Sequence, residues 1–128
     1  MKFLLDTHLL LWIAGQPDRL PNAVHAALLE ASHEFLFSAA SIWEIVIKAT
    51  LGRADFQIDP GLLRSGLLTN GYRELTITSQ HVLAVRTLPP LHKDPFDRML
   101  VAQAQVENAT LLTSDPAVAK YPGPIRQV

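Results

Sequence analysis

Lys2-Phe3-Leu4-Leu5 is a short apolar run that ends at Asp6, and this stretch decides how the chain folds. A short apolar run before a helical pattern predicts a buried strand. A carboxylate beside a buried segment costs free energy unless something positive meets it. The first expected strand therefore ends on a charge that needs an explanation.

The same alternation of short apolar strands and helices continues along the chain. The expected strands are Lys2–Leu5, Phe35–Ser38, Tyr72–Thr76, Thr110–Thr113 and, at an edge, Ile125–Val128. The expected helices are Thr7–Ala14, Pro21–Ser32, Ala40–Leu51, Pro60–Leu68, Thr78–Leu88, Pro95–Asn108 and a short turn, Pro116–Lys120. This order predicts an α/β fold, a doubly wound three-layer α/β/α arrangement with a four- to five-stranded parallel sheet. Ligands bind such sheets beyond the carboxyl ends of the strands.

Composition limits the class of protein. The 128 residues are expected to form a single domain, 1–128, and the 48% apolar content suits a buried core. The net charge of −1 gives no overall basic field for nucleic acid, so any such contact must come from a local patch. The absence of Cys excludes thiol chemistry and fits the cytoplasm, where we expect the protein. No apolar run is long enough for a membrane span, and no signal peptide is expected.

Four acidic residues, Asp6, Glu44, Asp97 and Asp115, each allow an ordinary structural explanation. Asp6 and Asp115 are placed to cap the helices that follow them, and Asp97 to complement a helix dipole. Glu44 is spaced to pair with Lys48 one helical turn later. Taken singly, each residue fits its structural explanation or a functional role equally well. One shared site explains all four residues, and their mutual repulsion would be relieved by a hard cation, Mg²⁺ or Mn²⁺.

Neighbouring residues suggest supporting roles. Thr7, Ser41 and Thr113 could hydrogen-bond carboxylates or a metal-bound water, and Asp94 is expected to cap the helix that carries Asp97. A local basic patch could hold a phosphate backbone, and its candidate RNA-binding residues are Lys48, Arg53, His92, Lys93 and Arg98. Trp43 is expected in the core, and His81 at the surface or its boundary.

Four segments, in this order, resemble a PIN domain, and more narrowly a VapC-type toxin of a type II toxin–antitoxin system. They are Leu4-Leu5-Asp6-Thr7-His8, Ser38-Ala39-Ala40-Ser41-Ile42-Trp43-Glu44-Ile45, His92-Lys93-Asp94-Pro95-Phe96-Asp97-Arg98-Met99-Leu100-Val101-Ala102-Gln103-Ala104, and Leu112-Thr113-Ser114-Asp115. Each segment alone is weak evidence, whereas the ordered set spans essentially the whole chain and is specific.

The resemblance implies a catalytic and metal-binding set of Asp6, Glu44, Asp97 and Asp115, with Glu44 either a direct ligand or acting through a water. It also implies a Mg²⁺- or Mn²⁺-dependent endoribonuclease that acts on RNA, a homodimer, and inhibition by a cognate antitoxin. The near-neutral charge favours a defined, folded RNA over nonspecific RNA binding.

Two other readings remain open. A phosphatase or phosphoacceptor domain can also carry an Asp after its first strand, but Asp6-Thr7-His8 lacks the Asp-x-Asp pattern of haloacid-dehalogenase-like phosphatases. A non-catalytic protein-binding module would use the acids only as helix caps. Failure to bind Mg²⁺ or Mn²⁺ would favour that module.

Overall fold

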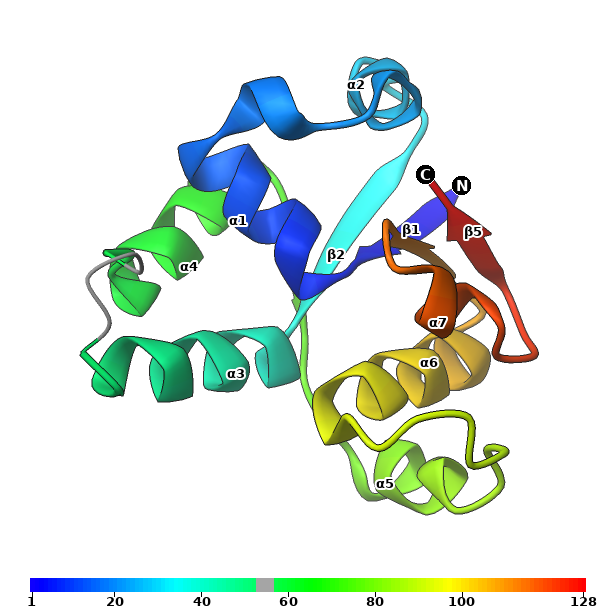
Figure 1. The fold of residues 1–128 in the computed structure, drawn as a ribbon. Helices are drawn as coiled ribbons and strands as arrows, with labels where there is room; N and C mark the ends of the chain where they lie inside the picture. Colours follow the sequence, from blue (N-terminus) through cyan, green and yellow to red (C-terminus); the bar gives the residue numbers. More distant parts are fainter. Residues whose placement is uncertain (53–56) are drawn as a thin grey trace.

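Five parallel strands form the sheet in the computed structural model, which describes residues 1–52 and 57–128 (Figure 1). The strands are β1 (Lys2–Leu5), β2 (Glu34–Ser38), β3 (Arg73–Leu75), β4 (Thr110–Thr113) and β5 (Ile125–Gln127). Their order across the sheet is β3-β2-β1-β4-β5. The predicted doubly wound parallel sheet is therefore confirmed.

Helices cover both faces of the sheet, as Figure 1 shows. They are α1 (Thr7–Gly15), α2 (Asn22–Leu28), α3 (Ala39–Thr50), α4 (Pro60–Thr69), α5 (Ser79–Val85), α6 (Pro95–Glu107) and α7 (Pro116–Ala119), with a 3₁₀ turn, η1 (Pro17–Arg19). None of the described helices is long and apolar enough to cross a membrane.

Two helices are shorter than their sequence patterns predict. The helix expected to reach Ser32 ends at Leu28, because the following residues turn the chain into β2, where the Glu34 N–H donates to the Met1 carbonyl (2.8 Å). The helix expected to reach Leu88 ends at Val85, ahead of Pro89-Pro90, which cannot continue a helix. Both differences lie at helix ends and leave the topology unchanged.

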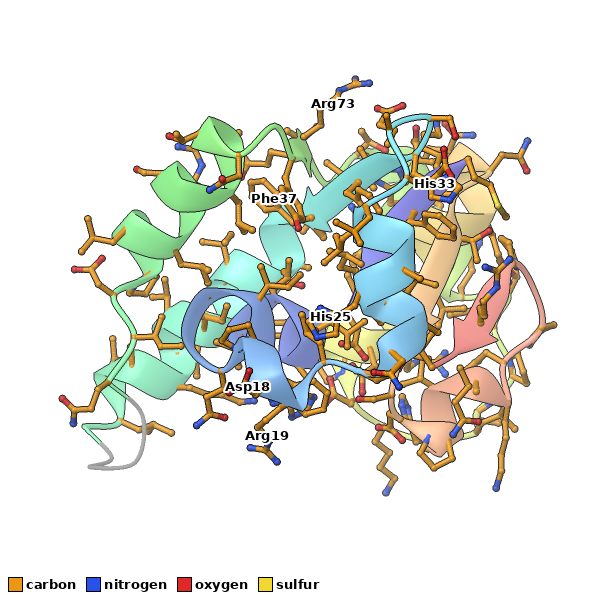
Figure 2. All side chains as sticks on the ribbon, turned by 90° about the horizontal axis from the view of Figure 1, so that it is seen from above. Asp18, Arg19, His25, His33, Phe37 and Arg73 are labelled. Atoms are coloured by element: carbon orange, nitrogen blue, oxygen red, sulfur yellow. The ribbon has the colours of Figure 1, made fainter. Side chains whose placement is uncertain are left out.

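Alternate residues of each strand pack into two separate cores. Phe3 and Leu5 of β1 join the core beneath α1, α2 and α4, whereas Leu4 joins the core beneath α6. This is the two-residue period of a strand buried on both faces. In Figure 2, Phe37 of β2 points toward α4, and Arg73 at the edge of the sheet points outward.

The topology places a reversal of strand order at the carboxyl ends of β1 and β4. These strands are neighbours, with Leu5 opposite Leu112, but the chain leaves β1 toward β2 and reaches β4 only after α6. Such a reversal of strand order is where open α/β sheets bind ligands. Asp6 follows β1 directly, and Asp115 lies two residues after β4.

Candidate active site

Asp6 is buried at the start of α1 and uses its two carboxylate oxygens differently. Oδ1 accepts a hydrogen bond from the Leu9 N–H (2.9 Å) and so caps the helix. Oδ2 accepts from the Thr113 hydroxyl (2.6 Å), which comes from the end of β4. Burial raises the pKa of Asp6, and the Thr113 hydrogen bond is the largest effect opposing that rise. Asp6 can therefore cap α1 with one carboxylate oxygen and still take part in the acid site with the other.

Glu44 lies on the buried side of α3, which Ser38 begins by accepting a hydrogen bond from the Ala40 N–H (3.0 Å). Its Oε2 pairs with the Lys48 ammonium (3.1 Å), as the helical spacing predicts. Its Oε1 is buried and has no hydrogen-bond partner among the described residues. A buried carboxylate oxygen without a partner is costly, so this atom is suited to receive a ligand.

Asp97 stands at the third position of α6, and Asp94 caps that helix as expected. The Asp94 Oδ1 accepts from the backbone N–H groups of Phe96 (2.9 Å) and Asp97 (3.1 Å). Burial, followed by the charges of Asp94 and Glu44, raises the pKa of Asp97 to about 7; His92 opposes the rise, and Asp6 adds to it. The negative charges of Asp94, Glu44 and Asp6 therefore all act on Asp97 and disfavour its ionisation.

Asp115 is linked to the other acids through Thr113. Its N–H donates to the Thr113 hydroxyl (3.0 Å), while its Oδ1 caps α7 by accepting from the Ala117 N–H (2.8 Å). Its charge is not among the causes that shift the pKa of Asp6 or Asp97. Asp115 is thus adjacent to the site but electrostatically less involved than the other three acids.

The supporting residues bond to one another or to the acids. Thr7 donates from its hydroxyl to the Ser41 hydroxyl (2.9 Å), and both side chains are buried. Because Thr7 begins α1 and Ser41 lies one turn before Glu44, this bond fixes Asp6 relative to Glu44. Thr113 connects Asp6 with Asp115.

The donor set fits a hard divalent cation in its chemistry. It offers only carboxylate oxygens, one of them the unpartnered Oε1 of Glu44, and their mutual repulsion would be reduced by a cation. Within residues 1–52 and 57–128, no group of three or more His, Asp or Glu side chains is arranged to hold an ion directly. Mg²⁺ retains several waters and binds through one or two carboxylates, so an ion at this site would be held partly through waters.

The basic residues around the acids separate into different roles. Lys48 pairs with Glu44, and Lys93 is exposed. Arg98 faces the fold instead, because its guanidinium donates to the carbonyls of Pro89 (3.0 Å) and Val85 (3.3 Å). These contacts hold its guanidinium against the fold, and its role as an RNA-binding residue stays a prediction. Arg53 lies outside the described residues.

Three side chains have surroundings that the sequence does not predict. Trp43 is 59% exposed and packs edge-on against Phe96, so its assignment to the core is wrong. His81 is fully buried, which corrects its expected position at the surface or its boundary; its Nδ1 accepts from the Thr78 N–H (3.0 Å), and its Nε2 contacts Glu107 (2.8 Å). Tyr121 is buried and contacts His92. A capping-box spacing from Thr78 was the available signal for His81.

A model of the PIN domain matches residues 3–124. The chain belongs to the PIN-domain family. The resemblance inferred from the sequence is therefore confirmed at the level of the family. The comparison with curated proteins found no match.

Solved structures share the fold of this PIN domain at low sequence identity. VapBC2 from Rickettsia felis, bound to a DNA fragment from its promoter, matches with a TM-score of 0.74 and 14% identity, covering 99% of this chain and 98% of that one. DNA-bound VapBC from Salmonella typhimurium matches with a TM-score of 0.67 and 15% identity, covering 99% of this chain and 98% of that one. VapBC-1 from nontypeable Haemophilus influenzae matches with a TM-score of 0.63 and 18% identity, again covering 99% of this chain and 98% of that one.

Proposed function

We propose that this PIN domain is a metal-dependent endoribonuclease and the toxin of a toxin–antitoxin pair. The observation that carries the proposal is the half-buried Asp97, whose pKa is raised first by desolvation and then by the nearby charges of Asp94, Glu44 and Asp6. Mutually repelling carboxylates at a switch point of the sheet are costly without a cation. Proteins of the PIN family are nucleases that generally use divalent metals, which agrees with this donor set.

Asp6 and Asp97 would hold Mg²⁺ or Mn²⁺, with Glu44 completing the set directly or through a water. When bound, the cation lowers the pKa of its water and neutralises charge on the phosphodiester. The protein itself holds the carboxylates in position. Thr113 holds one oxygen of Asp6, and the Leu9 N–H holds the other. Asp115 would act through its link to Thr113.

The cleavage test needs a variant that separates helix capping from catalysis. Asp6→Asn keeps a side chain that can cap α1 but removes the charge. Asp59→Asn is the matched control, because Asp59 caps α4 through the Leu62 N–H (3.0 Å) and lies outside the acid cluster. Total RNA incubated with Mn²⁺ should be cut by the wild type and by Asp59→Asn, and not by Asp6→Asn.

Mapping the cleaved ends would identify the RNA and the cleavage site. Equal cleavage by wild type and Asp6→Asn would refute the assignment of the site. Failure of the wild type to bind Mg²⁺ or Mn²⁺ at millimolar concentration would favour a non-catalytic protein-binding module.

An antitoxin partner is proposed to dock in an apolar groove away from the acids. A cavity of about 1030 Å³ lies between α1, α4 and the amino ends of β2 and β3. Its apolar lining includes Ile13, Leu28, Phe35, Leu63, Leu67 and Tyr72, and its acidic residues are Glu30, Glu34 and Asp59. This combination suits an amphipathic helix that carries basic residues.

The groove and the acid site lie at opposite ends of α1. Ile13, Ala14 and Gly15 line the groove at the end of α1, whereas Asp6 caps its start. The nine residues of α1 span about 13 Å at 1.5 Å per residue. A partner that fills the groove would reach the acids with roughly four extended residues. A basic side chain on that extension could pair with the carboxylates.

The docking proposal is tested on an exposed residue of the groove. Leu62 is 74% exposed and lines the cavity, so Leu62→Glu should prevent copurification of the partner without changing RNA cleavage. Leu29→Glu is the control, because Leu29 is 87% exposed and does not line the cavity. Unchanged copurification with Leu62→Glu would place the partner elsewhere.

A homodimer is proposed through a second apolar surface. We define the α3/α5 face as the exposed residues Trp43, Val46 and Ile47 of α3 with Val82 and Leu83 of α5. These two helices flank α6 in Figure 1. Exposed apolar side chains of this kind are available to pack against a second copy of the chain.

A further inference from the structure

The turn after α1 carries an arginine that is held in place but has no acidic partner. Arg19 lies at the end of η1, and its side chain projects outward in Figure 2. Its guanidinium lies over the Trp12 ring, 5.2 Å from the centroid, and Nη1 donates to Oε1 of Gln16 (3.1 Å). No carboxylate within residues 1–52 and 57–128 forms an ion pair with Arg19, although the adjacent Asp18 is exposed. Arg19 is therefore oriented, and most of its N–H donors remain available to a ligand.

Trp12 connects this arginine to the acid site. Its indole packs against the core beneath α1. The exposed His8 lies one helical turn earlier on the same side of α1, with its ring 6.3 Å from the Trp12 ring. Burial raises the pKa of Asp6, and the charge of His8 is among the effects that oppose the rise. His8 is therefore near the Asp6 carboxylate.

We define the α1 strip as His8, Trp12 and Arg19. It begins beside the acids and ends at η1. An imidazole carries at least one N–H in its neutral and its charged forms, so the exposed His8 offers a donor whichever nitrogen holds the hydrogen. Among the described residues, no acid forms an ion pair with His8 or Arg19. A strip with donors at both ends and a permanent positive charge at one is complementary to phosphates.

We propose that the α1 strip binds the backbone of the RNA strand on one side of the cleaved phosphodiester, with His8 and Arg19 each donating to a phosphate oxygen. The proposal rests on the nuclease function proposed above and adds a binding surface beside its acid site. Arg19 suits this role because a planar guanidinium can donate to two phosphate oxygens at once. Trp12 is a positioning residue, since the side chains of His8 and Arg19 both lie against its ring.

The charge of the strip favours RNA over the proposed protein partner. The groove assigned to that partner has acidic residues in its lining and therefore suits a basic helix, which Arg19 would repel. The strip and the groove also use different sides of α1. Ile13 and Ala14 line the groove, whereas none of the three strip residues does.

The strip is tested by the binding of a labelled single-stranded RNA of about ten nucleotides to the Asp6→Asn protein. Residue 6 is uncharged in this parent, so a change at His8 cannot act through the Asp6 carboxylate. At about 50 mM salt, Arg19→Gln should weaken binding about fivefold to tenfold, and the slope of log Kd against log salt should fall by about 0.7, the value for one phosphate of a single strand. His8→Ala should also weaken binding, and His8→Gln, which keeps a donor, should recover part of the loss.

Arg73→Gln is the matched control. It removes the same charge from an exposed arginine that lies on the opposite side of the molecule from Arg19 in Figure 2. Its RNA affinity and salt slope should equal those of the parent. An equal loss in Arg73→Gln and Arg19→Gln would show that only net charge matters and would overturn the strip.

The positioning by Trp12 is tested by combining two substitutions. Trp12→Leu should weaken RNA binding, and adding Arg19→Gln to it should weaken binding little further, because the arginine is no longer held. If Trp12 were only structural, Trp12→Leu would lower the melting temperature and leave the effect of Arg19→Gln intact. A titration of the ¹⁵N-labelled parent with the same RNA needs no further variant. The side-chain N–H signals of His8, Trp12 and Arg19 should shift, and that of Arg73 should not.

The two proposals fail in different ways. If the parent binds RNA but Arg19→Gln binds it equally well, or if the signals of His8 and Arg19 do not move, the strip is refuted and the nuclease function stands. If Arg19→Gln loses the copurified protein partner and keeps its RNA affinity, the strip belongs to that partner and the proposal is overturned. If the wild type cuts no RNA and the parent binds none, both proposals fall together.

Discussion

Thr113 donates a hydrogen bond of 2.6 Å to Oδ2 of Asp6 and so joins the carboxyl ends of β1 and β4. The same hydroxyl accepts from the Asp115 N–H at 3.0 Å. One small side chain therefore sets the position of the first acid, favours its charged form, and ties it to the segment that carries the last acid. Its removal should affect metal binding more than folding.

Thr113→Val keeps the shape of the side chain and removes both hydrogen bonds. Because the lost bond stabilised the charged form, the pKa of Asp6 should rise further, and the carboxylate should bind a cation less readily. We expect the Mn²⁺ concentration for half-maximal cleavage to increase about tenfold, with a stability loss of about 1–2 kcal/mol. Thr110→Val, at the other end of β4, is the control. An unchanged Mn²⁺ requirement would contradict the role of Thr113.

The stability of the metal-free protein should fall as the pH rises from 5 to 8. The pKa of Asp97 is raised to about 7 from a usual value of 3.8, so the folded state holds this proton more tightly than the unfolded state. Its contribution to stability is complete below pH 3.8 and is lost as the pH passes through about 7. The raised pKa of Asp6 acts in the same direction. Melting temperatures measured in the presence of a chelator check this.

Asp97→Asn supplies the control for that pH dependence. The amide cannot ionise, so the decline in melting temperature should be smaller than in the wild type. Added Mn²⁺ should stabilise the wild type more at pH 8 than at pH 5, because ionised carboxylates bind the cation. If the melting temperature of Asp97→Asn falls with rising pH as steeply as that of the wild type, Asp97 is not the cause of the pH dependence.

The order of the elements and the position of the acids could be predicted because both depend on local sequence. The apolar run before Asp6 and the Asp-Pro pairs at Asp94 and Asp115 mark a strand end and two helix starts. From the sequence alone, helix capping and one shared site are competing explanations for the acidic residues. The structure shows both at Asp6, because its two oxygens serve different partners.

The remaining features depend on contacts that no local pattern reports. Trp43 is apolar, but its side chain stays 59% exposed although it packs edge-on against Phe96 of α6. His81 is buried because Glu107, far along the sequence, reaches its ring. Arg98 turns inward because Tyr121 and the carbonyl of Pro89 receive its donors. No sequence pattern points to Tyr121, because the two residues that donate to its hydroxyl, Arg98 and His92, lie far from it along the chain.

Glu44→Gln should abolish cleavage without destabilising the fold. The amide retains the size of the side chain and removes a buried negative charge that has one unpartnered oxygen. Lys48→Met is the informative comparison, because it removes the partner of Oε2 and leaves the carboxylate. We expect Lys48→Met to lose about 1 kcal/mol of stability and to retain metal-dependent cleavage at a higher RNA KM. Cleavage by Glu44→Gln at the wild-type rate would remove Glu44 from the site.

Val82→Asp should convert the proposed dimer to a monomer. Val82 is 52% exposed on the α3/α5 face, so a charge there costs little in the monomer but must be desolvated at an interface. Leu29→Asp places the same charge at an exposed apolar position after α2, away from that face, and should leave the dimer intact. Light scattering of the purified proteins distinguishes the two states. A dimer that survives Val82→Asp, or that is lost equally in Leu29→Asp, would show that the chain pairs through another surface.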